Sequence, residues 1–243
     1  NRTWLAMIGG INIITTQNEQ LSVSNFGDSV SIPSNLISSI EQDASGNIWI
    51  GTLDVGAFQL VPKKTGYQMI MFDQRKGLTD SRIWDIFCEN NGNVWFGSNE
   101  NGVYLWDSVS MQNISTKNGL PGNLILTLYR DNNRNLWLGS MNGLSLFQGF
   151  HLVHYSAADG LPGTQVLAVK NDRNNSLWVG GDGKGLVKVT VHNDQMVSQN
   201  IQIAGYKSTQ VTTLDCDDFG NLIIGTRGDG IAIMKNSRFY YLT

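Results

Sequence analysis

The three histidines are the residues whose chemistry would be easiest to recognise, because imidazole serves both as a metal ligand and as a general base. His151 and His154 lie in a segment expected to be a β-strand, where their i, i+3 spacing places them on opposite faces. His192 follows another expected strand. A metal or catalytic site needs several such groups to converge, and the sequence offers no such cluster. We therefore predict no catalytic residue, no metal and no cofactor.

The two cysteines are candidates for a disulfide. Cys88 and Cys216 occupy the same position of a repeated unit, but in units three repeats apart. Neighbouring sheets stack roughly 10 Å apart, whereas a disulfide needs Cα atoms within about 7 Å of each other. We predict two free, buried thiols, which leave the cellular compartment undecided.

One aromatic residue is a candidate for ligand binding. Trp84 lies between Arg82 and Asp85, so its ring could stack on a sugar while its neighbours orient the hydroxyl groups. The equivalent positions of the other repeats hold Ser38, Leu126, Leu167 and Thr212. The alternative is structural: Trp84 plugs a central channel or packs between sheets.

These residues must be positioned by a repeated unit, which is the strongest feature of the sequence. A strand-like phrase of an apolar residue, Trp, an apolar residue and Gly recurs at intervals of 41 to 46 residues. Its second position, which we call the marker, is occupied by Trp4, Trp49, Trp95, Trp137, Trp178 and, in the last copy, Ile223. A period of roughly 40 to 45 residues with several short strands per unit is typical of a β-propeller.

Each unit is expected to contain four strands, and the turn between the first two has a constant composition. An acidic residue lies six positions before the marker, at Asp43, Glu89, Asp131, Asp172 and Asp217. Three positions before the marker lie Gly46, Gly92, Arg134, Asn175 and Gly220. Gly and Asn tolerate a positive φ and Asp binds its own turn backbone, so this is hairpin chemistry. Arg134 departs from the pattern and should be slightly strained if it is left-handed.

The repeat predicts an all-β fold, a propeller of four-stranded antiparallel blades with about six blades represented. The expected blades of this single, partial propeller are residues 1–31, 32–77, 78–119, 120–160, 161–207 and 208–243. The first blade lacks its innermost strand, which would precede residue 1, so we expect a piece of a longer protein. The recurring Trp should fill the space between neighbouring blades, because a single four-stranded sheet cannot bury both of its faces.

Propeller geometry places one set of loops on a common face. Loops that join the fourth strand to the next blade share this face with the turns between strands two and three, and ligands commonly bind there. The candidate ligand-binding residues on this face are Arg82, Trp84, Glu100, Asn123, Asn142, Thr164, Gln165, Asp182 and Arg227. Each polar residue taken alone is equally consistent with solvated surface.

Composition excludes several other classes of protein. The net charge is −3 with no basic run, so we expect no nucleic-acid partner. No stretch approaches the roughly 20 apolar residues of a membrane-spanning helix. The sequence also lacks the motif around a phosphoacceptor His and the Gly-rich nucleotide-binding loop of a histidine kinase.

Three phrases resemble the two-component regulator propeller repeat: Asp-Gly-Leu-Pro-Gly at 159–163, Leu-Trp-Leu-Gly-Ser at 136–140 and Asn-Gly-Leu at 142–144. The likeness extends over nearly the whole chain in four good copies. The first and last copies are degenerate, with Met7 where Thr or Ser is usual and Ile223 in place of Trp. The resemblance implies the extracytoplasmic, periplasmic sensor part of a bacterial inner-membrane receptor. The output of such receptors is usually a histidine kinase, sometimes a diguanylate cyclase, and several sense oligosaccharides released from glycans.

Three functions therefore stay open. The leading one is a ligand-sensing module whose partners would be an oligosaccharide and the rest of a parent receptor chain. The second is a scaffold for protein–protein interaction, including a homodimer of the receptor. The third is an enzyme such as a lyase, which would require His and acidic residues clustered at the channel mouth.

Overall fold

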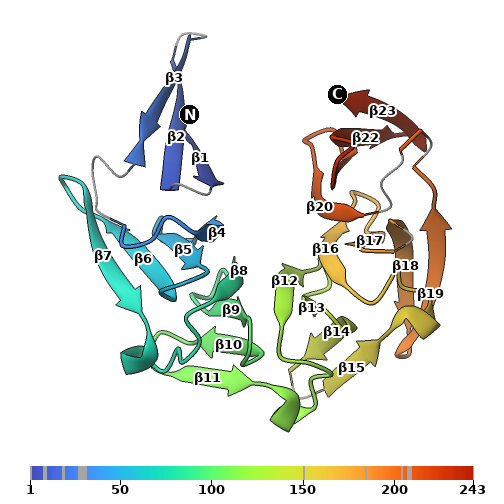
Figure 1. Ribbon diagram of the computed structural model, residues 1–243, viewed down its shortest axis with the longest axis horizontal. Coiled ribbons are helices and arrows are strands. Elements are labelled where there is room, and N and C mark those ends of the chain that lie inside the picture. Colours follow the sequence, from blue (N-terminus) through green and yellow to red (C-terminus); the bar gives the residue numbers. More distant parts are fainter. Residues whose placement is uncertain are drawn as a thin grey trace. The chain divides into compact units, whose positions relative to one another are not determined.

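The protein is described by a computed structural model that covers residues 2–7, 10–17, 20–26, 32–149, 151–183, 185–203, 205–206 and 210–242. The chain forms two compact units, Asn1–Ser115 and Thr116–Thr243, and each is described by itself. Every sheet in both units is antiparallel, and its strands follow one another in chain order (Figure 1). None of the helical segments in the described ranges is long and apolar enough to cross a membrane.

The first unit contains one three-stranded and two four-stranded sheets, which we number as blades one to three. Blade one consists of β1 (Arg2–Met7), β2 (Gly10–Gln17) and β3 (Gln20–Asn25). Blade two consists of β4 (Ile37–Gln42), β5 (Ile48–Thr52), β6 (Ala57–Pro62) and β7 (Tyr67–Phe72). Blade three consists of β8 (Ile83–Cys88), β9 (Val94–Ser98), β10 (Val103–Trp106) and β11 (Met111–Ile114).

The second unit contains three four-stranded sheets, blades four to six. Blade four consists of β12 (Ile125–Arg130), β13 (Leu136–Ser140), β14 (Gly143–Gln148) and β15 (His151–Tyr155). Blade five consists of β16 (Val166–Asn171), β17 (Leu177–Gly181), β18 (Leu186–His192) and β19 (Gln195–Ile201). Blade six consists of β20 (Val211–Cys216), β21 (Leu222–Thr226), β22 (Ile231–Lys235) and β23 (Arg238–Leu242).

These sheets confirm the predicted fold class of propeller blades. Five sheets have four strands, and the described part of the first sheet has three, with the Trp4 strand β1 at its edge. This strand corresponds to the second strand of the other blades, so the innermost strand is the one that blade one lacks. The residue boundaries between blades stay a prediction.

The marker Trp fills the space between neighbouring blades, as predicted. Trp137 of blade four is 3% exposed and belongs to a buried cluster with Val166, Val169 and Val179 of blade five. Trp49 and Trp178 likewise pack against blades three and six. The Gly two residues after the marker permits this close packing: a Cβ at Gly139 would lie 2.5 Å from Thr127 Cγ2 and 2.9 Å from the carbonyl oxygen of Val166.

A hydrogen bond that the sequence analysis did not foresee joins the acidic turn residue to the Trp six positions later. In blade four, Asp131 Oδ1 accepts the backbone N–H groups of Asn133 and Asn135, while Oδ2 accepts the Trp137 indole N–H at 2.9 Å. The same indole bond is made by Trp49 to Asp43, Trp95 to Glu89 and Trp178 to Asp172, at 2.9, 2.7 and 3.0 Å. The fixed spacing of six residues therefore lets one carboxylate bind both the backbone of the turn and the indole of the buried Trp.

The predicted left-handed residue of this turn is confirmed. Arg134 has φ 66° and Asn175 has φ 61°, in the region where blades two, three and six have Gly. A non-Gly residue with a Cβ is disfavoured there, so Arg134 is strained as expected.

The loops that enter the next blade contain short 3₁₀ turns. They are η2 (Gln74–Lys76), η3 (Thr116–Asn118) and η4 (Ala157–Asp159). The residues that follow each turn are a left-handed Gly and then a buried Leu: Gly77 and Leu78, Gly119 and Leu120, Gly160 and Leu161. In this Gly-Leu pair of the repeat, the Gly allows the chain to reverse direction. The Leu then packs into the core and fixes the loop.

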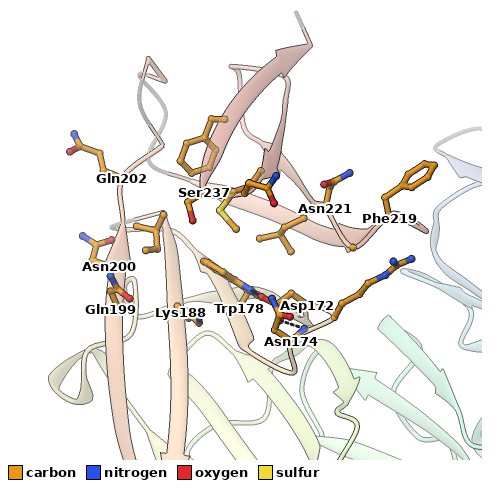
Figure 2. A pocket seen from close by; sticks show the side chains of 17 residues that line it. Asp172, Asn174, Trp178, Lys188, Gln199, Asn200, Gln202, Phe219, Asn221 and Ser237 are labelled. Atoms are coloured by element: carbon orange, nitrogen blue, oxygen red, sulfur yellow. Dashed lines mark hydrogen bonds between the residues drawn. The ribbon is translucent and has the colours of Figure 1, made fainter.

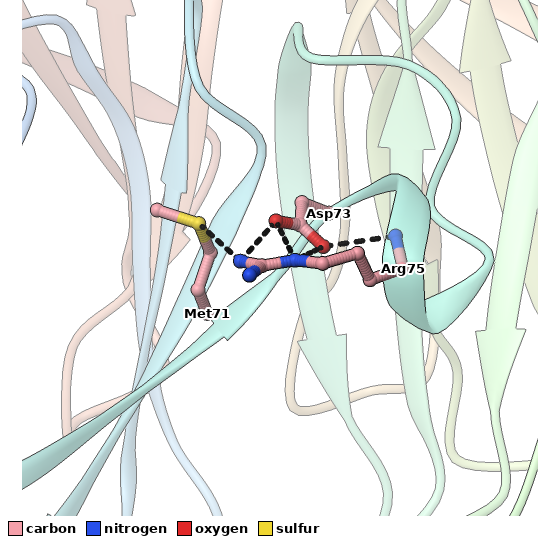
Figure 3. Close-up of polar contacts among 3 residues, drawn as sticks. All are labelled: Met71, Asp73 and Arg75. Carbon is pink, nitrogen blue, oxygen red and sulfur yellow. Dashed lines mark hydrogen bonds and ion pairs between the residues drawn. The ribbon is translucent and has the colours of Figure 1, made fainter.

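Asp73 caps the first of these turns (Figure 3). Its Oδ1 accepts the backbone N–H of Arg75 at 2.9 Å, and its Oδ2 accepts both Nε and Nη2 of the Arg75 guanidinium. These hydrogen bonds hold the pKa of Asp73 below its usual value. Because the Arg75 side chain is 80% exposed, the ion pair orders the loop more than it stabilises the fold.

Both cysteines are free, as predicted, but they are half-buried rather than fully buried. Each one is in the first strand of its blade, on the second residue before the turn. Burial, with smaller effects of the nearby Glu41 and Asp43 charges, raises the pKa of Cys88. Burial also raises the pKa of Cys216, so both stay protonated at neutral pH and react slowly.

Candidate functional site

The turns between the second and third strands form half of the candidate surface, and a Ser or Thr hydroxyl fixes the turn in blades two, three, four and six. Thr52 Oγ1 donates to the carbonyl oxygen of Gly56 at 2.8 Å and accepts the N–H of Val55 at 3.1 Å. Equivalent bonds to a turn carbonyl are made by Ser98, Ser140 and Thr226. The Ser or Thr after the marker Gly therefore holds this turn in one conformation.

The first strand of each four-stranded blade carries a β-bulge close to the same surface. The pairing of β8 with β9 shifts between Ile83 and Asp85, which leaves Trp84 as the extra residue. The extra residues of the other blades are Ser38, Leu126, Leu167 and Thr212. A bulge re-aims the side chain of its extra residue. The repeat position that holds Trp84 in blade three is therefore a bulge in every four-stranded blade.

Trp84 is held within its own blade. It is half-buried, and its indole N–H donates to Asn99 Oδ1 at 3.0 Å in the turn after β9. Its neighbour Asp85 accepts a hydrogen bond from Ser39 Oγ of blade two at 3.0 Å. The ring is therefore fixed in orientation rather than mobile, which suits either a ligand platform or a packing role.

Arg82 and Glu100 are brought together as an ion pair across the loop and the turn of blade three. Their side chains are 43% and 67% exposed, so the pair lies at the surface beside Trp84. Beneath them Asp80, which the sequence analysis did not select, is 6% exposed. Asp80 accepts the backbone N–H of Arg82 at 3.0 Å and that of Glu100 at 2.6 Å, and so positions both residues.

A similar link between loop and turn recurs in three other blades. Ser34 Oγ donates to Asp54 Oδ1 at 2.5 Å, and Asn142 Nδ2 donates to the carbonyl oxygen of Pro121 at 2.9 Å. In blade five the N–H of Gln165 donates to Asp182 Oδ1 at 3.0 Å. Asn142 and Asp182 therefore link the entering loop of their blade to its turn. In the sequence, a polar residue about twenty positions after the loop residue indicates this link.

The three remaining candidates also lie on loops or turns of the second unit. Asn123 Oδ1 accepts the N–H of Thr116 at 2.9 Å, and Arg227 Nη1 donates to Gln210 Oε1 at 3.4 Å. Thr164 is exposed beside Gln165. Arg82, Trp84 and Glu100 thus form a group in the first unit, while the other six candidates lie in the second. Ligand binding by any of them stays a prediction.

The histidines do not form a site with other metal-ligating residues in the described ranges. His151 pairs with Asp194 at 2.9 Å on an exposed surface. Burial lowers the pKa of His154, whose Nδ1 lies 3.4 Å from Ser145 Oγ. His192 is the last residue of β18 rather than a residue after it. No group of three or more His, Cys, Asp or Glu residues that could hold a metal ion occurs in the part of the chain that the structure describes.

The sequence model of a family described as "two component regulator propeller" matches four segments: residues 31–54, 77–100, 119–142 and 160–183. The last three matches begin in the loop that enters a blade, and every match ends in the turn after the second strand of its blade. The matches therefore contain eight of the nine candidate residues, all except Arg227. A search of curated proteins finds no match to the sequence.

Solved structures share the fold at low sequence identity. The extracellular domain of a protein described as a hybrid two-component system, BT3049 from B. thetaiotaomicron, is 21% identical over 95% of this chain and 31% of its own, with a TM-score of 0.75. PorZ, a surface component of the type-IX secretion system of Porphyromonas gingivalis, is 14% identical over 100% of this chain and 40% of its own, with a TM-score of 0.71. Virginiamycin B lyase from Staphylococcus aureus, in an inactive variant with quinupristin, is 13% identical over 99% of this chain and 80% of its own, with a TM-score of 0.75. The chain thus spans less than half the length of the first two.

Proposed function

Because the chain belongs to the two-component regulator propeller family, we propose that it is a non-enzymatic ligand-recognition module in the extracytoplasmic part of a bacterial membrane-bound signalling receptor. The receptor would be a two-component histidine kinase that resides in the inner membrane, with this module on its periplasmic side. The ligand would be an oligosaccharide derived from a glycan. Any kinase or cyclase activity would belong to the rest of the parent chain.

The observation that carries this proposal is the position of the family matches. They cover the loop and turn segments of the candidate surface in blades two to five. In blade three this surface combines an oriented aromatic ring with an exposed ion pair, Trp84 beside Arg82 and Glu100. An indole face packs against the C–H groups of a pyranose ring, and charged or amide groups bind its hydroxyls. The likeness to an extracellular domain of a hybrid two-component system supports the same placement.

The test is a thermal-shift screen of the protein against oligosaccharides released from plant and host glycans. A ligand present at about 100 times its Kd adds about 2.7 kcal/mol to the stability of the folded state, which raises the melting temperature measurably. The Trp84→Ala variant should lose this rise while keeping the melting temperature of the ligand-free protein within a few degrees. A folded protein that shows no rise with any oligosaccharide in the screen would overturn the sensing role.

A scaffold for protein–protein interaction is the second candidate, favoured by apolar side chains exposed on outer strands. Leu21 and Val23 on β3 are 72% and 67% exposed, and Tyr240 and Leu242 on β23 are 54% and 57% exposed. Such residues are typical of surfaces that another chain covers, including a second copy in a homodimer. Sedimentation analysis of the protein and of a Leu21→Ser, Val23→Ser variant separates this role from ligand sensing, because the variant would change assembly and leave the oligosaccharide response intact.

A further inference from the structure

A pocket of about 680 Å³ opens between blades five and six, both in the second unit (Figure 2). It lies at the ends of the strands opposite to the candidate surface, where the first strand turns into the second and the third into the fourth. Its lining comes from the turns 172–174 and 219–222, from Trp178 and Lys188, and from the outer strands of both blades. No residue of the candidate surface lines it.

The carboxylate at the floor of the pocket is already engaged in hydrogen bonds. Asp172 Oδ2 accepts the Trp178 indole N–H at 3.0 Å, and Oδ1 accepts the backbone N–H groups of Asn174 and Ser176 at 2.9 Å. Lys188 Nζ lies 5.7 Å from the centre of the Trp178 ring, in cation–π contact. Arg173 also lines the pocket and is exposed. Asp172 is therefore already used by the turn, while the two cationic side chains leave room for a neutral or an anionic ligand.

The wall of the pocket offers amide groups. Gln199 and Gln202 lie along the outer edge of blade five, and both are exposed (Figure 2). Gln199 is in register with Lys188, on the face of the blade that carries Trp178. On the opposite wall, Ser237 contributes a hydroxyl from the turn of blade six. Each amide both donates and accepts hydrogen bonds, as does each hydroxyl of a sugar, so this wall complements a polyhydroxylated molecule.

The rim of the pocket carries an aromatic ring in an unusual place. Phe219 is 84% exposed on the turn between β20 and β21, where the equivalent residue of blade five is Asn174. Phe239, half-buried on β23, lies on the same pocket. A solvent-exposed Phe contributes little to the fold, but its face can cover the C–H groups of a sugar ring.

The equivalent pocket between blades four and five provides an internal comparison. Its volume is about 400 Å³, and Thr190, Val191 and His192 occupy its outer part. These residues belong to the hairpin β18–β19, which has seven residue pairs, whereas β22–β23 has five. The shorter hairpin of blade six leaves the larger space open, and only this larger pocket has an aromatic residue at its turn.

We propose that the pocket between blades five and six binds an oligosaccharide, with Phe219 against a sugar ring and the amides of Gln199 and Gln202 on its hydroxyls. The inference shares the carbohydrate class of the proposed function but not its site. It gives the protein a second recognition surface at the opposite ends of the strands.

The two sites can be observed separately in one experiment, because seven tryptophans give seven indole N–H signals. Trp178 forms the floor of this pocket, and Trp84 lies on the candidate surface. We would label the protein with ¹⁵N-tryptophan, assign both signals by Trp→Phe substitution, and titrate with cellohexaose, mannohexaose and xylohexaose. A tetragalacturonate serves as the anionic probe. The expected result is a saturable shift of the Trp178 signal with at least one of these oligosaccharides.

Phe219→Ala should weaken that binding about tenfold, the loss that corresponds to one aromatic contact. Val109→Ala is the matched control, because Val109 is 86% exposed on another turn and should leave the affinity unchanged. A shift of Trp84 alone would overturn this inference and leave the proposed function standing. A shift of Trp178 that Phe219→Ala does not weaken would overturn the role of the rim. No shift of either signal would overturn both sites.

Discussion

Blade four and blade six build the same turn from the same kind of acidic residue, yet they use it differently. In both blades one carboxylate oxygen accepts two backbone N–H groups of the turn, from Asn133 and Asn135 in blade four and from Phe219 and Asn221 in blade six. The second oxygen of Asp131 also accepts the indole N–H of Trp137. In blade six the marker is Ile223, which has no such donor and is half-buried.

The comparison separates two functions of the repeat that the sequence presents as one. The turn is a local structure that forms with or without the Trp. The Trp joins its blade to the next one, and its bond to the acidic residue satisfies the one polar atom of a ring that is otherwise enclosed by apolar side chains. Four predictions test this division, in decreasing order of expected effect.

The largest effect should come from removing the ring between blades. Trp137→Ala should lower the free energy of unfolding by about 3 to 5 kcal/mol, because it leaves a cavity against Val166 and Val169. Ile223→Ala, at the same repeat position, should cost about 1 kcal/mol because the side chain is only half-buried. Urea denaturation followed by far-UV circular dichroism measures both. Equal losses in the two variants would contradict the assignment of the Trp to inter-blade packing.

The next effect should come from the acidic residue itself. Asp131→Ala should cost about 2 to 3 kcal/mol, because it leaves the buried indole N–H and two turn N–H groups without their acceptor. Asp217→Ala should cost less, since its blade has no indole to leave unpaired. The variant pair Asp131→Ala and Trp137→Phe should be non-additive in a double-mutant cycle, because the two residues share one bond. Additive losses would show that the indole bond contributes nothing.

The sequence predicted most of the fold and less of the site. The spacing of the marker and the acidic residue predicted the blades, the turn and the left-handed Arg134, because each depends on local chemistry that repeats. Spacing cannot show which neighbour a side chain meets, so the indole bond, the bulge at Trp84 and the support from Asp80 were missed. The ion pair of Arg82 with Glu100 was not predicted either. Propeller geometry placed both residues on a common face but could not show that their side chains meet.

The acidic turn also makes stability depend on pH. Burial on its own would raise the pKa of Asp43, but hydrogen bonds from Asn47, Trp49 and Ser45 outweigh it and lower that pKa below the usual value. A lowered folded-state pKa means that the stabilisation is complete above the unfolded value, about 3.9, and is lost as pH falls through the folded value. Asp43→Asn should therefore be less stable than the native protein at pH 7, with the difference shrinking below about pH 4. A difference that stays constant from pH 7 to pH 2 would contradict this role of the carboxylate.

The smallest effect should come from the backbone of the turn, where blade four departs from its neighbours. Arg134 is exposed and has φ 66°, whereas blades two, three and six have Gly at this position, with φ of 82 to 92°. Replacing Arg134 with Gly relieves the crowding of its Cβ but loosens the unfolded chain, so the net gain should be about 0.5 to 1 kcal/mol. Arg134→Asn should gain a similar amount, since Asn tolerates the left-handed region and Asn175 already occupies it in blade five. Because Asp131 and Trp137 keep their bond in both variants, a gain would show that the turn can be improved independently of the packing between blades. A loss in both variants would mean that the Arg134 side chain contributes to the turn in a way that outweighs its strained backbone.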